Sequence, residues 1–316
     1  MANFDPLGDG SPIRFIQPGG GFCFGLELFW GRVRRSLLRT FFPGYVKRME
    51  SLRRGECPGC THHIIDSRDL KNYANVCGYY FDSKTDPYDH RNHLAFARWG
   101  AMELLVFSFL LLLLSAGCGV LASMVHPAFW VGTVVAGGFW VFVLSFFRNP
   151  KRKIPEGPGV VVSPADGTIT NIEEVEEPGF GKALRISIFL SVFNVHVNRS
   201  PMAGSVLRVR YFPGEFLDAR SGDCSRRNEQ LWLDMKSKEG GFAFRVKQIA
   251  GAIARRIVCR TAEGRNLAMG ELYGMIKFGS RTDLLLPPEV VYEVAVQVGQ
   301  KVRGGSTILL TLQNRL

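Results

Sequence analysis

The segment from Leu104 to Phe147 constrains the fold of this chain most strongly. Its 44 residues contain no Asp, Glu, Lys or Arg, and its one histidine, His126, stands beside Pro127 near the middle. A membrane-spanning helix needs about 20 consecutive apolar residues. The segment therefore predicts two spans, Leu104–Met124 and Ala128–Phe147, which form a helical hairpin that crosses a bilayer and returns. The alternative is a buried pair of core helices, but such helices normally carry a polar face.

The charges on either side of this segment predict its orientation. Residues 1–103 carry 14 Lys or Arg against 11 Asp or Glu, and residues 148–316 carry 25 against 17. The turn between the spans carries neither Lys nor Arg. Because Lys and Arg are enriched on the cytoplasmic side, both flanks are expected there, at the cell (inner) membrane. The basic flanks suit an anionic membrane surface, and no run resembles a nucleic-acid groove, so no nucleic-acid partner is expected.

Residues 1–97 are predicted to be an N-terminal extension. From Phe24 to Met49, apolar residues alternate with arginines and lysines. This pattern is typical of a basic amphipathic helix, which either lies on the membrane face or is an ordinary surface helix.

The extension also contains a cysteine pattern. Cys57 and Cys60, followed by Cys77, have the spacing of a zinc ribbon, and residues 57–80 resemble the ribbon of acetyl-CoA carboxylase β subunits. Tyr80 stands where that ribbon has its fourth cysteine. We therefore expect a degenerate ribbon without bound zinc; the alternative is that a nearby histidine completes an improvised site.

Residues 98–150 are assigned to the hairpin and its linker, and residues 151–316 to a compact, mostly β domain. This last region alternates short apolar runs with turn signals. The predicted strands are Val160–Val162, Ala183–Leu190, Gly204–Tyr211, Phe242–Ile249, Ile257–Cys259, Val290–Val296 and Thr307–Leu312. A brief helix is predicted over Gln248–Arg256, and the turn at Val298–Gly305 resembles biotinyl/lipoyl-type barrels. The expected fold class is thus a membrane-anchored α+β protein.

Three strings in the β domain carry a further resemblance. They are Ser-Pro-Ala-Asp-Gly-Thr at 163–168, Phe-Asn-Val-His-Val-Asn-Arg at 193–199 and Lys-Phe-Gly-Ser-Arg-Thr-Asp at 277–283. Together they resemble phosphatidylserine decarboxylases. The match is to the compact bacterial branch, which has a two-span hairpin followed by a string like Phe-Phe-Arg-Asn-Pro at 146–150. The longer-known bacterial enzymes have a second histidine where this chain has Phe193.

The resemblance implies that the chain cuts itself between Gly279 and Ser280. The products would be a β chain, 1–279, and an α chain, 280–316, which remain associated. Ser280 would become a pyruvoyl group, the only cofactor expected. A self-made ketone suits the chemistry, because an amine that loses CO2 needs an electron sink that no ordinary side chain supplies.

The resemblance also suggests which residues assist. Serine is a weak nucleophile and needs a base, and His196 is the only histidine among residues 148–316. Asp166 is the expected orienting carboxylate, so that Ser280, His196 and Asp166 form the catalytic set.

The expected reaction is the decarboxylation of phosphatidylserine to phosphatidylethanolamine, with membrane lipid as the partner. Arg281, Arg199 and Arg255 are the candidates for holding the substrate's phosphodiester. Two alternatives stay open: a decarboxylase of another serine-headed (ether) lipid, and a non-catalytic, membrane-anchored lipid-binding module. The sequence also leaves open whether two copies pair as a homodimer.

Overall fold

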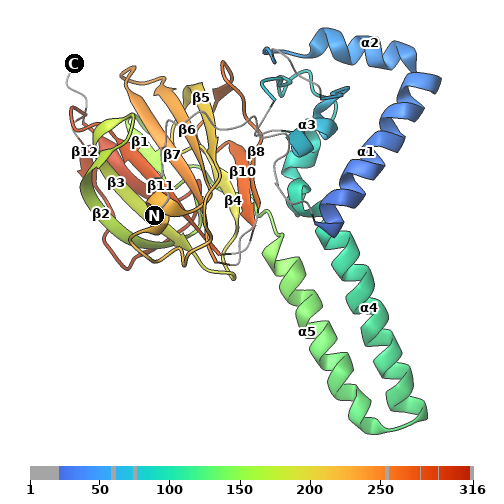
Figure 1. The fold of residues 1–316 in the computed structure, drawn as a ribbon. Coiled ribbons are helices and arrows are strands. Elements are labelled where there is room, and N and C mark those ends of the chain that lie inside the picture. The colour runs from blue at the N-terminus through green and yellow to red at the C-terminus, as the bar shows by residue number, and fades with distance from the viewer. Residues whose placement is uncertain are drawn as a thin grey trace.

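The computed structural model describes residues 21–57, 62–73, 77–252, 256–277, 279–290 and 292–313. It has three parts: a helical N-terminal extension, a long helical hairpin and a β domain (Figure 1). The hairpin projects away from both other parts, which lie together at its base (Figure 1).

The hairpin consists of α4, Ala101–Met124, and α5, Trp130–Phe146. Both helices are long and apolar enough to cross a membrane, by length and composition. They pack along each other, and the hydroxyls of Ser115 and Thr133 each donate to the other residue's carbonyl at 3.3 Å. The two apolar helices predicted from the sequence are therefore confirmed. Most of their large apolar side chains point outward rather than into a protein core.

The β domain is built on one eight-stranded antiparallel sheet. Its strand order is β13-β2-β3-β11-β7-β6-β5-β9. The strands are β2 (Gly167–Glu177), β3 (Gly181–Leu190), β5 (Gly204–Phe212), β6 (Gln230–Ser237), β7 (Ala243–Ala250), β9 (Asn266–Leu267), β11 (Ser280–Leu286) and β13 (Lys301–Val302). One face of the central strands carries the core side chains Leu231, Leu233, Val246 and Leu284. Their period-2 spacing is why these segments fold as strands.

Two three-stranded sheets complete the domain. One has the order β4-β10-β8, formed by Val197–Arg199, Leu272–Lys277 and Arg256–Cys259; the other has the order β1-β14-β12, formed by Val160–Val162, Ile308–Leu312 and Tyr292–Val294. The only helix described in this domain is the single turn α6, Cys224–Arg227. The helix predicted over Gln248–Arg256 is wrong for its first part, because β7 continues to Ala250, and for its last residue, because Arg256 begins β8. Residues 253–255 lie outside the described residues. The mostly β domain itself is confirmed.

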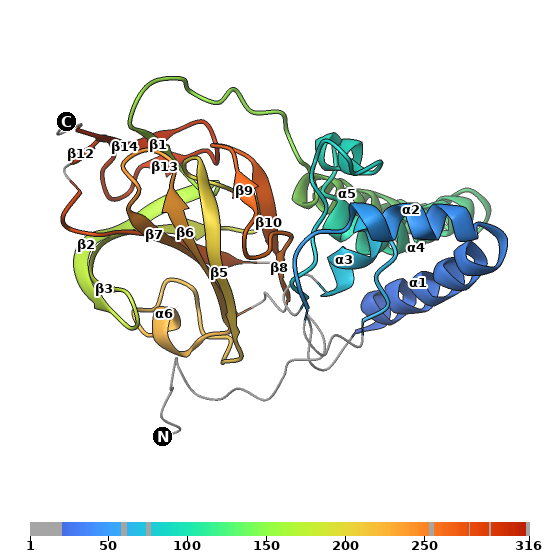
Figure 2. The ribbon, with the colours of Figure 1, turned by 90° about the horizontal axis from the view of Figure 1, so that it is seen from above.

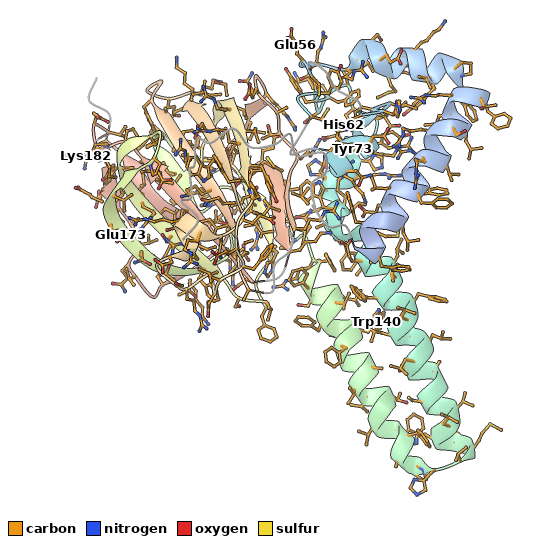
Figure 3. The ribbon with its side chains drawn as sticks, viewed as in Figure 1. Glu56, His62, Tyr73, Trp140, Glu173 and Lys182 are labelled. Carbon is orange, nitrogen blue, oxygen red and sulfur yellow. The ribbon has the colours of Figure 1, made fainter. Side chains whose placement is uncertain are left out.

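The extension contains α1 (Phe22–Phe41), α2 (Pro43–Leu52) and α3 (Ser67–Tyr73). Seen from above, these helices lie beside the β domain rather than on top of its sheet (Figure 2). They share a small core that includes Met49, Ile65 and Leu70. The rings of His62 and Tyr73 stack with their centroids 4.6 Å apart (Figure 3).

The predicted zinc ribbon lies within this part of the extension. Cys57 and Cys77 belong to or pack against the small core, and Cys60 lies outside the described residues. Arg54 and Tyr80 form an isolated antiparallel bridge that joins the two arms of the segment. Within the described ranges, no group of three or more His, Cys, Asp or Glu side chains is arranged to hold a metal ion.

Candidate active site

The Gly279–Ser280 bond lies where β10 passes into β11. β11 begins at Ser280 and lies between β3 and β7, with Ser280 opposite Leu190 and Ala250. Gly279 has a φ of 59°, a left-handed conformation that favours glycine. The Ser280 side chain is fully buried, and its hydroxyl has no hydrogen-bond partner among the described residues. A buried hydroxyl without a partner costs about 1–3 kcal/mol, so this one requires an explanation.

A second glycine lies against the same bond. A Cβ added to Gly251 would be 2.3 Å from the carbonyl oxygen of Gly279 and 3.1 Å from the Cβ of Ala219. Real Cβ atoms do not approach backbone oxygens so closely, so only glycine leaves the Gly279 carbonyl where it is. The sequence offered no specific signal for this role, because Gly251 meets Gly279 only through strand pairing.

We expect Gly251→Ala to slow cleavage of the Gly279–Ser280 bond by about 100-fold, since moving a reacting group by about 1 Å costs that much. The added methyl group must displace the Gly279 carbonyl, which the Ser280 hydroxyl would attack. The rate is measured from the appearance of the 37-residue fragment by mass spectrometry.

Gly222→Ala is the matched control, because a Cβ there meets nothing within 4 Å and Gly222 has no positive φ. Equal cleavage rates in the two variants would contradict the role given to Gly251.

His196 lies just before β4 and is fully buried. Its Nδ1 is 2.9 Å from the carbonyl oxygen of Asn194, so Nδ1 carries the proton and donates it to that oxygen. Nε2 is then a free acceptor, and it has no hydrogen-bond partner in the described structure. Burial, assisted by the charge of Arg148, lowers the pKa of His196 to about 4. The imidazole is therefore neutral at physiological pH, as a general base must be.

Backbone pairing places His196 beside the segment that leads to Gly279. The Ile276 amide of β10 donates to the His196 carbonyl at 3.2 Å, three residues before Gly279. The described structure contains no hydrogen bond between the imidazole and the Ser280 hydroxyl. Ser280 Oγ and His196 Nε2 are both buried polar atoms without hydrogen-bond partners in the described structure.

Asp166 occupies the turn between β1 and β2. Its Oδ1 accepts from the Gly304 amide at 2.8 Å, and its Oδ2 pairs with Arg152 at 2.6 Å. Neither oxygen contacts His196 in the described structure. The arrangement in which Asp166 orients His196 is therefore not formed here, and the three-residue catalytic set stays a prediction.

A buried polar chain runs beside Ser280. Gln248 Nε2 donates to Asn198 Oδ1 at 2.8 Å, and Asn198 Nδ2 donates to Thr282 Oγ1 at 3.1 Å. Ser280 and Thr282 are two apart in β11, so their side chains share one face of the sheet. These two hydrogen bonds therefore connect β4, which follows His196, to β11, which begins with Ser280. Sequence reasoning missed it, because Gln248 lies in no motif.

Asn228 fixes the loop after β5 next to the first residue of β11. Its Nδ2 donates to the carbonyls of Leu217 at 2.9 Å and Ala250 at 2.7 Å, and its Oδ1 accepts from the Leu217 amide. Because Ala250 pairs with Ser280, this buried amide holds the loop next to the Gly279–Ser280 bond.

The three candidate arginines have different surroundings. Arg281 points to the opposite face of the sheet from Ser280, where it binds Asp283 at 2.7 Å and the Ser187 hydroxyl at 2.7 Å. Arg199 donates to the Gly270 carbonyl at 3.1 Å and lines a cavity of about 560 Å³. Arg255 lies outside the described residues. Their role in phosphate binding stays a prediction.

The loop that contains His196 packs on the base of the hairpin. The ring centroids of Phe146 and His196 are 4.3 Å apart, and Val195 shares a buried apolar cluster with Phe146. Phe193, which is 71% exposed, contacts Phe142 edge to face, and its carbonyl accepts from Arg148 at 2.8 Å. The candidate base is thus attached directly to the end of the second apolar helix.

Residues 139–310 match the sequence model of the phosphatidylserine decarboxylase family. A phosphatidylserine decarboxylase proenzyme from Rhodopirellula baltica is 42% identical over 256 residues, which cover 77% of this chain and 99% of that protein. Proenzymes of the same name from Symbiobacterium thermophilum and Gluconacetobacter diazotrophicus are 46% and 44% identical. They align with 60% and 63% of this chain and with 86% and 91% of their own lengths. The chain therefore belongs to the phosphatidylserine decarboxylase family.

Proposed function

We propose that this chain cuts itself between Gly279 and Ser280 and then decarboxylates phosphatidylserine to phosphatidylethanolamine. Family membership and the proenzyme names of its relatives support this function. The observation that carries the cleavage site is the fully buried Ser280 hydroxyl, which has no hydrogen-bond partner in the described structure and follows a glycine at positive φ. The proposed products are a 279-residue β chain and a 37-residue α chain.

In the proposed cleavage, Ser280 Oγ attacks the carbonyl carbon of Gly279. The C–O bond of an ester forms as the C–N bond breaks, and the hydroxyl proton passes through a base to the departing nitrogen. We assign the base to His196, whose neutral imidazole has an unoccupied Nε2. Elimination then breaks the bond between the ester oxygen and the Cβ of residue 280, which releases the Gly279 carboxylate as the end of the β chain and leaves a dehydroalanine. Hydrolysis of the dehydroalanine releases ammonia and leaves a ketone at position 280.

That pyruvoyl group would supply the electron sink which decarboxylation of an amine requires. The surrounding residues fit it, since position 280 is enclosed by β3, β7 and the polar chain that ends at Thr282. After cleavage, we assign the return of a proton to the product to His196 as well; its Nε2 must first take up a proton from water, because the neutral imidazole carries none at that atom.

We further propose that the hairpin anchors the protein in the inner membrane with the β domain on the cytoplasmic side. The turn at the tip of the hairpin carries no Lys or Arg, whereas the segments on either side of its base do. This distribution agrees with the positive-inside rule. The loop carrying His196 then lies at the membrane surface, and the exposed Phe193 ring faces the lipid headgroups. A serine headgroup would thus reach the site without its acyl chains leaving the bilayer.

The domain boundaries proposed are 1–97, 98–150 and 151–316. In this division the α chain contributes β11 to β14, and we propose the segment from β13 to β14 as the biotinyl/lipoyl-like element. The two strands lie in different sheets, where β13 pairs with β2 and β14 pairs with β1 and β12. Zinc has no part in the proposed chemistry.

The function is tested on the purified wild-type protein in detergent or vesicles. Intact-mass analysis should find two chains, with the smaller one blocked to Edman sequencing by its keto terminus. Vesicles that contain phosphatidylserine should release CO2, and borohydride should stop this release by reducing the ketone. A single uncut chain that binds the vesicles without releasing CO2 would support a non-catalytic lipid-binding module instead.

A further inference from the structure

A cluster of five charged side chains, three of them buried and two partly buried, joins the extension, the hairpin and the β domain. Its members are Glu27 of α1, Lys71 of α3, Glu103 in the first turn of α4, Arg256 of β8 and Lys277 of β10. Glu27 accepts from Lys71 at 2.8 Å and pairs with Arg256 at 3.3 Å. Glu103 pairs with Arg256 at 3.6 Å and forms a short ion pair with Lys277. Two acids from outside the sheet therefore hold two cations inside it.

The two cations need these acids. Arg256 and Lys277 are directly opposite each other in the β8–β10 pair, where like charges repel. Both side chains are almost fully buried, with 3% and 4% exposure, so water screens the repulsion weakly. Burial, followed by the charge of Arg256, lowers the pKa of Lys277 to about 8. Removing one partner from a buried ion group leaves an uncompensated charge, which is strongly unfavourable.

The position of Lys277 connects this cluster to the proposed reaction. Lys277 is the last residue of β10, two residues before Gly279. A shift of Lys277 would therefore move the Gly279 carbonyl relative to the Ser280 hydroxyl. Glu27 acts on this end of β10 from far away in the sequence, because its partner Arg256 lies 229 residues later.

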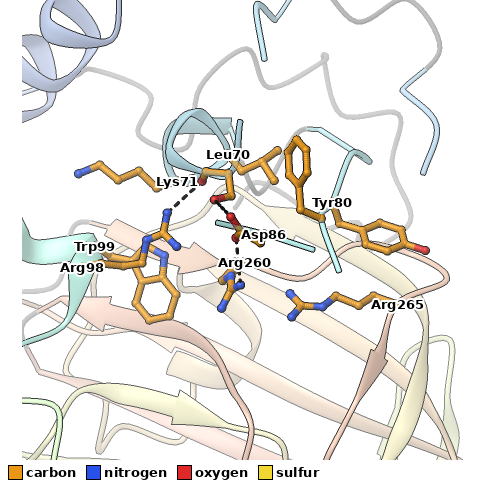
Figure 4. A pocket seen from close by; sticks show the side chains of 10 residues that line it. Leu70, Lys71, Tyr80, Asp86, Arg98, Trp99, Arg260 and Arg265 are labelled. Atoms are coloured by element: carbon orange, nitrogen blue, oxygen red, sulfur yellow. Dashed lines mark hydrogen bonds and ion pairs between the residues drawn. The ribbon is translucent and has the colours of Figure 1, made fainter. Parts of the chain in front are cut away.

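Other contacts hold the extension in the same place. Arg260, just after β8, is 3.9 Å from Asp86 of the extension (Figure 4). It is also 3.1 Å from Asp89. Arg265 reaches the Ser83 hydroxyl at 3.3 Å. The ring of Phe24, one turn before Glu27, packs 4.9 Å from the Arg256 guanidinium. The extension is thus docked on the strand that pairs with β10.

We propose that Glu27 is a positioning residue for self-cleavage, through which the N-terminal extension fixes the end of β10 that carries the Gly279–Ser280 bond. Glu27 and Lys71 both precede the family match at 139–310, so the proposal gives the extension a role in the maturation of its own chain. The inference rests on the proposed function, because it requires that the chain cuts itself.

The test uses the full-length chain synthesised in the presence of vesicles, with the fraction cut followed over time. Glu27→Gln should slow the appearance of the 37-residue chain at least tenfold. Glu50→Gln is the matched control, since Glu50 is an exposed acid of the same extension, and it should be cut at the wild-type rate.

A second variant separates positioning by charge from loss of structure. Glu27→Gln leaves the cluster with one acid and three cations, and adding Lys71→Gln restores the original net charge. The double variant should therefore recover most of the cleavage rate. A purely structural role predicts the reverse, because the double variant removes one more ion-pairing group.

Three outcomes decide the matter. Recovery in the double variant supports the proposal. Wild-type cleavage in Glu27→Gln, or further slowing in the double variant, overturns it. A wild-type chain that remains whole overturns the proposed function itself, which distinguishes that failure from a failure of this inference.

Discussion

Ser280→Ala should yield a single, uncut 316-residue chain that contains no reactive ketone and releases no CO2 from phosphatidylserine. The substitution removes the only hydroxyl that can attack the Gly279 carbonyl. Folding should survive, because the Ser280 hydroxyl makes no hydrogen bond among the described residues. Replacing a buried, unsatisfied hydroxyl with a methyl group leaves the stability of the precursor unchanged or raises it by about 1 kcal/mol. Intact mass and thermal unfolding measure the two effects.

Ser237→Ala provides the matched control for this prediction. Ser237 is another buried serine, at the end of β6, and its hydroxyl donates to the Glu239 carbonyl. This variant should lose some stability and still be cut. Normal processing of Ser280→Ala would remove the basis for a pyruvoyl group at position 280.

His196→Ala should slow self-cleavage by about 10²–10⁴-fold, the usual contribution of a positioned general base. The pH profile of the wild type should be equally informative. Because the pKa of His196 is about 4, the base is uncharged from pH 6 to 8, and protonation of His196 should lower the rate only as the pH approaches 4. Cleavage rates of the refolded precursor, measured from pH 4 to pH 8, test this expected pH dependence.

The lowered pKa of His196 also makes the stability of the native state fall at low pH. The native state resists protonation of His196, whereas the unfolded chain takes up a proton near pH 6.5. The stabilisation is therefore complete above pH 6.5 and is lost as the pH falls from 6.5 to 4. His90→Ala, at an exposed histidine of the extension, should change neither profile. If cleavage were unaffected in both His196→Ala and Asp166→Asn, the proposed catalytic set would fail while the cleavage site remained.

The sequence predicted those parts of the fold that local patterns determine. The uncharged stretch 104–147 became α4 and α5, since any bilayer-length apolar run forms a helix that satisfies its own backbone. Val160–Val162 was predicted with the bounds of β1, and Ala183–Leu190 lies within β3. The helix predicted over Gln248–Arg256 was wrong for Gln248–Ala250, because Gln248 and Ile249 are held by strand partners on both sides, which override local preference.

The site was predictable only where a residue lies in a motif. Ser280, His196 and Asp166 could be named, but the sequence could not say that the Asp166 carboxylate binds Arg152 and the Gly304 amide. Gly251 and Gln248 could not be found, because their roles arise from contacts between strands that are distant in sequence. These contacts exist only once the sheet has formed.

Because β11 lies in the middle of the eight-stranded sheet, a cut at its first residue changes how the molecule can refold. Before cleavage, β11 reaches its place between β3 and β7 as part of one continuous chain. After the proposed cut, a denatured molecule would have to regain that strand from solution, so its recovery would depend on concentration. The serine that would form the ketone would also be consumed. Each copy could then mature only once, and its working lifetime would be set by how slowly it first unfolds.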